Sequence, residues 1–97
     1  MPESDSILKD MGAATWSAED GTAYEVALEG INHVVGALSR QIGEAESVGD
    51  ADRVAELSEQ QRSWAGRRRE LSPADRAAVD ALTTECADLL RALRGTT

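Results

Sequence analysis

The side chains that catalysis or metal binding would use are few and widely spaced. His33 is the only histidine, and Glu29 precedes it by one helical turn. A carboxylate and an imidazole four residues apart can share a metal ion, but a site needs three or four ligands, and the local spacing supplies no third one. We therefore expect an exposed pair of side chains here, and we predict neither a metal nor a cofactor.

Cys86 is the only cysteine, which excludes an intrachain disulfide and favours a reducing, cytoplasmic location. A catalytic cysteine needs a base beside it. Cys86 falls on an apolar helical stripe, where a small hydrophobic side chain is expected, and His33 points away from the stripe of its own helix. A Ser–His–Asp arrangement would depend on the same histidine. We predict that the chain is not an enzyme.

The segment WAGRRRE, which begins at Trp64, is the most conspicuous local cluster. Tryptophan and arginine are the residue types most frequent at binding hot spots. In one interpretation this surface anchors an acidic partner, or the acidic half of a second copy, through Gln61, Trp64, Arg67, Arg68 and Arg69. In the other, Trp64 lies in the core while Arg67 and Arg69 are solvated. The sequence leaves both interpretations open.

Charge is unevenly distributed along the 97 residues, which form one small domain with a net charge of −8. Residues 1–52 contain eleven acidic residues against Lys9 and Arg40, whereas residues 53–97 contain seven acidic residues against eight arginines. An acidic chain repels nucleic acids and anionic membranes. No apolar run approaches 18 residues, and the start of the chain lacks the pattern of a signal peptide. We expect neither direct nucleic-acid binding nor membrane insertion.

The first predicted helix spans residues 22–48. Thr22 and Glu25 have the spacing of a capping box, and Gly49 is placed to end the helix. Its apolar residues recur at alternating steps of four and three, which is typical of coiled-coil packing. These residues are Tyr24, Leu28, Ile31, Val35, Leu38, Ile42 and Ala45.

Two further helices are predicted at 51–70 and 73–94. Asp50 is placed to cap the second, and the third opens with Ser72 as N-cap, Pro73 at the first helical position and Asp75 in the first turn. The third helix carries the clearest apolar stripe. That stripe consists of Val79, Leu82, Cys86, Leu89 and Leu93, widened by Leu90.

Short connections predict that consecutive helices are antiparallel neighbours. The expected fold class is all-α: an antiparallel three-helix bundle, or coiled-coil-like helical hairpin, over residues 22–95. Residues 1–21 are expected to form a mobile acidic tail. Because so small a core is marginal alone, we also expect a homo-oligomer, most simply a dimer.

Glycines are unusually frequent in the first helix, although each costs roughly 0.5–1 kcal/mol relative to alanine in a helix interior. Gly30, Gly36 and Gly43 lie beside the main stripe rather than on it. A flank containing Asn32, Gly36 and Gly43 has small side chains, which let another helix approach closely. One interpretation is a second docking surface, and the other is that the glycines are exposed and have no role.

Every regular feature of the sequence concerns packing. The predicted function is therefore a non-catalytic helical protein–protein interaction module, which associates with itself or binds a helical partner. Its predicted binding residues are Asn32, Gly36, Gly43, Gln61, Trp64, Arg67, Arg68 and Arg69. The alternative is an acidic nucleic-acid mimic that inhibits a DNA- or RNA-binding enzyme, with Glu44, Glu46, Asp50 and Asp52 on its active surface.

Overall fold

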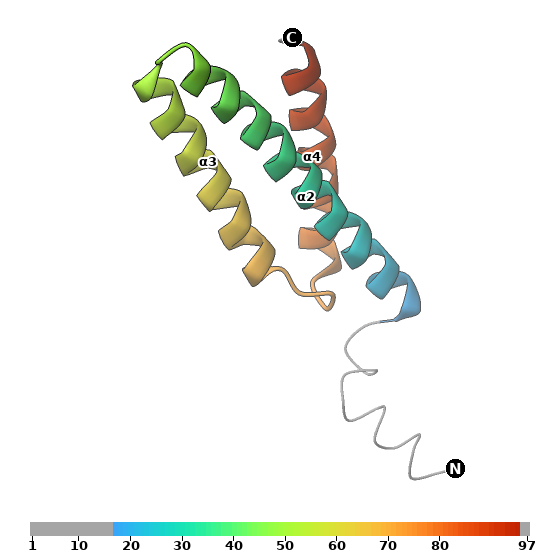
Figure 1. The fold of residues 1–97 in the computed structure, drawn as a ribbon. Helices are drawn as coiled ribbons and strands as arrows, with labels where there is room; N and C mark the ends of the chain where they lie inside the picture. Colours follow the sequence, from blue (N-terminus) through green and yellow to red (C-terminus); the bar gives the residue numbers. More distant parts are fainter. Residues whose placement is uncertain (1–16, 96–97) are drawn as a thin grey trace, which may run out of the picture.

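The computed structural model describes residues 17–95, which form three α-helices and no strand (Figure 1). The helices are α2 (Ala18–Ser47), α3 (Ala51–Glu70) and α4 (Arg76–Gly95). The predicted all-α fold class is confirmed. The predicted tail falls largely on residues 1–16, which lie outside the described residues.

Helix α2 is the central element, because α3 and α4 each pack against it. No Cα atom of α3 lies within 8 Å of a Cα atom of α4. Consecutive helices run antiparallel, so α2 and α4 point in the same direction (Figure 1). The arrangement is the predicted antiparallel three-helix bundle. The backbone of α2 lies close to the backbones of both α3 and α4.

Helix α2 begins four residues earlier than predicted. Its N-cap is Ser17, whose hydroxyl accepts a hydrogen bond from the Asp20 backbone N–H at 3.1 Å, while the Asp20 carboxylate accepts one from the Ser17 N–H at 3.1 Å. This reciprocal capping box satisfies two terminal donors. The predicted cap at Thr22 is wrong, because its hydroxyl instead donates to the Ala18 carbonyl within the helix.

Helix α2 ends where Gly49 adopts the positive φ of 73°. The Gly49 N–H donates to the Glu46 carbonyl and the Asp50 N–H donates to the Ala45 carbonyl, which together form a Schellman motif. The Asp50 side chain then caps α3 by accepting from the Arg53 N–H at 3.1 Å. The predicted glycine stop and aspartate cap are confirmed.

Helix α4 begins at Arg76, three residues later than predicted. The Asp75 carboxylate accepts a hydrogen bond from the Ala78 N–H at 3.1 Å, and the Asp75 carbonyl accepts one from the Val79 N–H. Asp75 is therefore the cap. The predicted cap, Ser72, instead accepts from the Ala74 N–H and belongs to the preceding turn.

The core lies along both sides of α2. Its fully buried large side chains include Ile31, Val34 and Leu38 from α2. Leu57 and Trp64 are buried from α3, and Val79, Leu82 and Cys86 from α4. The buried face of α2 is wider than the predicted stripe because α4 covers a second side of that helix, which buries Ala27, Val34 and Ala37.

Candidate functional site

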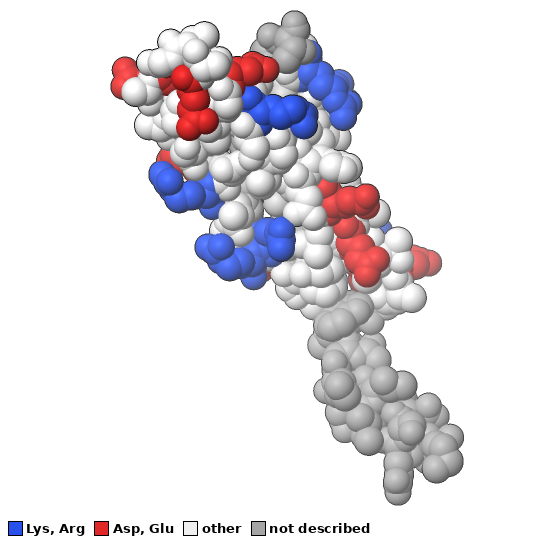
Figure 2. Space-filling view, in the orientation of Figure 1, with Lys and Arg blue, Asp and Glu red and all other residues white. Residues whose placement is uncertain are grey.

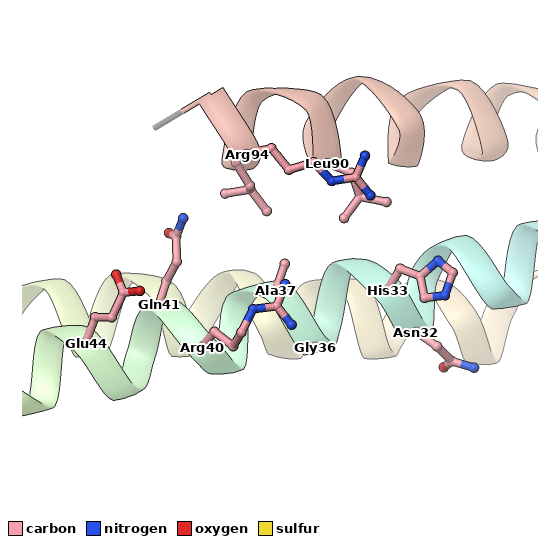
Figure 3. A pocket seen from close by; sticks show the side chains of 10 residues that line it. Asn32, His33, Gly36, Ala37, Arg40, Gln41, Glu44, Leu90 and Arg94 are labelled. Carbon is pink, nitrogen blue, oxygen red and sulfur yellow. The ribbon is translucent and has the colours of Figure 1, made fainter. Parts of the chain in front are cut away.

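A surface groove runs between the second half of α2 and the end of α4 (Figure 3). Its volume is ≈ 450 Å³. Leu90 of α4 and Ala37 of α2 point toward one another across it. The groove is lined by Asn32, His33, Gly36, Ala37, Arg40, Gln41, Glu44, Leu90, Leu93 and Arg94.

Two of the α2 residues that line the groove, Gly36 and Ala37, are small. Ala37 is buried, at 7% exposure. A Cβ atom added at Gly36 would meet nothing within 4 Å, so the absent side chain leaves open space. Leu90 and Leu93 are half-buried and supply apolar surface on the opposite side. The groove can therefore receive an apolar side chain from outside the bundle.

Basic and acidic groups stand at the rim of the groove. Arg40 and Glu44 come from α2, and Arg94 comes from α4. Arg40 is exposed, and its side chain forms no hydrogen bond or ion pair with any other residue in 17–95. A guanidinium in this position is able to bind a carboxylate that arrives from a partner.

Gly30 differs from the other glycines of α2, because α4 packs directly against it. A Cβ atom built at Gly30 would lie 3.2 Å from the Cβ and 3.4 Å from the Sγ of Cys86. Gly30 lies off the predicted apolar stripe, as expected, but it belongs to a second packed face of α2 that the stripe did not predict. Glycine at this position allows α2 and α4 to approach closely.

Cys86 itself is part of this contact. It is 1% exposed and reduced, and burial raises the pKa of its thiol. A buried thiol with a raised pKa remains protonated at neutral pH and is a poor nucleophile. His33 belongs to α2, whereas Cys86 belongs to α4, and the His33 side chain is exposed at the rim of the groove. Within residues 17–95 no three histidine, cysteine or acidic side chains form a cluster suited to a metal ion.

Trp64 lies in the core, where it is 8% exposed. The Arg67 guanidinium stacks over its ring, 4.6 Å from the ring centroid. The same guanidinium donates to both carboxylate oxygens of Glu85, at 2.8 and 2.6 Å, and thereby joins α3 to α4. Trp64 thus matches the core interpretation, but Arg67 is bound within the chain rather than left in solvent.

Gln61 and Arg68 form a stripe on α3 with Leu57 and Trp64, at steps of four and three, and their side chains also bind within the chain. Gln61 donates from its amide nitrogen to the Val35 carbonyl at 3.0 Å and to the Ser39 hydroxyl at 2.7 Å. Arg68 donates to the Asn32 side-chain oxygen at 2.8 Å. These contacts explain how two polar residues fit on a packed stripe. Whether any of them also contacts a partner stays a prediction.

The remaining predicted binding residues lie on two helices, α2 and α3. Gly36 lines the groove, with Asn32 beside it. Gly43 and Arg69 are exposed. Sequence reasoning overlooked Arg40 and Arg94 because they lie on different helices. The signal that could have found them was the parallel direction of the first and third helices, which brings their C-terminal halves together.

On the face drawn in Figure 2, acidic and basic side chains form separate groups with uncharged surface between them. Several arginines pair with nearby acids, as Arg76 does with Asp20 and Asp80 at 2.9 Å each. Acidic side chains gather at the end of the molecule where α2 turns into α3. Glu44, Glu46, Asp50 and Asp52 are all exposed there. Their action as a nucleic-acid mimic stays a prediction.

Known proteins do not identify the role of the groove. The chain matches no protein-family model, no curated protein and no solved structure. Among residues 17–95 no helix combines the length and hydrophobicity that crossing a membrane requires.

Proposed function

We propose that the chain is a non-catalytic protein–protein interaction module that binds a helix in the groove between α2 and α4. The observation that carries this proposal is the groove itself, in which small residues of α2 face Leu90 and Leu93 of α4. Helices pack closely where small residues on one surface receive larger side chains from another. The groove combines that shape with Arg40, whose charge would favour an acidic helix.

The proposal moves the predicted docking surface away from Trp64 and its arginines. Trp64 packs in the core, and Arg67 and Arg68 join α3 to α4 and α2, so replacing any of these three would disturb the fold as well as any binding. Gly36 is the predicted binding residue that remains open on the groove side. It is therefore the position at which docking can be tested without disturbing the core.

The test is a native pull-down with the full-length tagged chain at low and high salt, followed by measurement of the mass of the complex. A Gly36→Leu bait fills the groove, and a Gly66→Leu bait is its matched control on α3. We expect a helical protein, or a second copy of the chain, to bind the wild type and the control and to be lost from Gly36→Leu. Equal retention by both variants, or no retained protein at all, would contradict the proposal.

The same experiment separates the acidic alternative. A nucleic-acid enzyme that binds at low salt, is released at high salt and ignores Gly36→Leu would point to the acidic surface instead. Replacing Glu44, Glu46, Asp50 and Asp52 by their amides would then abolish the binding. The groove would in that case have no part in the function.

A further inference from the structure

Helix α2 exposes an apolar side chain close to two acidic ones. Val26 is 49% exposed, and only Val48 is also a large exposed hydrophobic residue within 17–95. Glu25 precedes Val26 by one residue and Glu29 follows it by three, and both are exposed as well. The Glu29 side chain forms no ion pair or hydrogen bond with another described residue. This part of α2, from Glu25 to Glu29, is called the acidic knob below.

The groove lies further along the same helix and has complementary properties. It offers small residues and leucines where the acidic knob offers a valine, and it offers Arg40 where the acidic knob offers Glu29. Glu29 and Arg40 are separated by about 16 Å along the helix axis, so they cannot pair within one chain. Helix α2 therefore carries two complementary surfaces, the acidic knob and one side of the groove, that cannot contact each other within one chain.

We propose that the partner in the groove is a second copy of this chain, bound with the two α2 helices antiparallel. This inference rests on the proposed function and names its partner. In a two-fold arrangement each copy presents its acidic knob to the groove of the other, so both contacts form together. The charge pattern along α2 favours this direction, because a parallel arrangement would place Glu29 against Glu29 and Arg40 against Arg40.

The spacing along α2 sets the register of the pair. When Glu29 lies opposite Arg40 of the second copy, Val26 reaches the level of Gly43 and Glu44, where the groove runs. Gly36 then lies opposite His33 of the second copy, close to the two-fold axis. Because Gly36 and Gly43 have open space in place of side chains, the two helices can approach closely along this line.

The test is a charge exchange measured by sedimentation velocity on the full chain over about 10 µM to 1 mM, a range suited to small, weak interfaces. The variants are Glu29→Arg, Arg40→Glu and the double exchange. We expect each single reversal to weaken dimerisation at least tenfold. Each Glu29–Arg40 contact occurs twice in a two-fold dimer, so one substitution places like charges against each other at two sites. The double exchange should restore dimerisation to within about threefold, since the pairs are re-formed with opposite polarity.

The two exposed valines supply a matched control. Val26→Glu should abolish dimerisation because it places a carboxylate against Glu44 of the second copy, whereas Val48→Glu, at the α2–α3 turn, should leave it unchanged. All of these positions are exposed, and circular dichroism confirms that each variant is folded. Unfolding of a variant would be recognised there and not mistaken for lost association.

The outcomes separate this inference from the proposed function. A dimer that the double exchange does not restore, or that Val48→Glu disrupts as strongly as Val26→Glu, would overturn the assigned surface. A strict monomer up to the highest concentration would overturn the second copy as partner. In either case, capture of another helical protein that depends on Gly36 would leave the proposed function standing.

Discussion

Gly30 and Gly36 lie on the same helix and beside the same neighbour, yet their surroundings are opposite. At Gly30 a single added carbon would press against Cys86 at 3.2 Å, whereas at Gly36 it would meet nothing within 4 Å. Both glycines weaken the helix to a similar extent. The first allows two helices of one chain to touch, and the second leaves room for something outside the chain.

The difference follows from where α4 is held. Its first half is joined to the rest of the bundle by Arg76 with Asp20, by Glu85 with Arg67, and by Cys86 against Gly30. Its second half contributes Leu90 and Leu93 to the groove. The α2–α4 pair is therefore closed at one end and open at the other.

Gly30→Leu is the change with the largest expected effect on this comparison. A leucine here must displace Cys86 and the α4 backbone, and we expect the free energy of unfolding to fall by about 2–3 kcal/mol. Urea unfolding followed by circular dichroism measures the loss. Gly36→Leu is the matched control and should unfold no more easily than the wild type. Similar losses in both variants would show that the two ends of the helix pair do not differ.

Gly36→Ala tests whether the α2–α4 pair is open at Gly36. The new methyl group enters open space, so the gain in helix propensity should raise the free energy of unfolding by about 0.5–1 kcal/mol. Gly66→Ala on α3 should give a similar gain, since its nearest neighbour would be the Arg69 guanidinium at 3.8 Å. The same urea titration compares them. A loss at Gly36 alone would mean that the groove is closed in solution.

Glu85→Gln removes the charge of the Arg67–Glu85 ion pair at the closed end of the α2–α4 pair, and its expected effect on the free energy of unfolding is smaller. Hydrogen bonds from Arg67 lower the pKa of Glu85 below its ordinary value of 4.5. Ionised Glu85 therefore stabilises the fold above that pH, and the stabilisation is lost as the pH falls through the lower folded value. Because both side chains are partly exposed, we expect the variant to lose under about 1 kcal/mol at pH 7.

The pH dependence distinguishes this ion pair from a general effect of the substitution. Between pH 7 and pH 3 the wild type should lose more stability than Glu85→Gln, as measured by urea unfolding at each pH. Asp20, whose pKa is lowered by the Ser17 backbone N–H and then by Arg76, keeps its own contribution in both proteins. Parallel pH profiles would show that Arg67 and Glu85 do not pair in solution.

The sequence predicted the three helices because their apolar periodicity is strong and their connections are short. The errors lie at two helix starts, where several polar residues compete as caps. Ser17 with Asp20 offers the same pattern as Thr22 with Glu25, and the structure uses the earlier pair. Asp75 likewise replaces Ser72, which is occupied in the turn. Local spacing alone does not rank such competitors.

The candidate site was less predictable, because it depends on contacts between helices. Gly36 was singled out by its residue type, but the residues that share the groove with it include Leu90 and Arg94 from another helix. Trp64 and Arg67 were conspicuous in sequence for the types of their side chains, and in the structure Trp64 packs in the core while Arg67 joins α3 to α4. A tryptophan beside arginines has the same sequence pattern whether it packs inside a chain or against a partner.

The central position of α2 determines the order in which the surfaces of the molecule form during synthesis. During synthesis α2 and α3 emerge first, and their short turn lets them close into a hairpin at little cost in loop entropy. Helix α4 is made last and packs on a side of α2 that the hairpin leaves uncovered. The groove needs both α2 and α4, so it is the last surface to form. A nascent chain therefore lacks the groove until α4 has packed against α2.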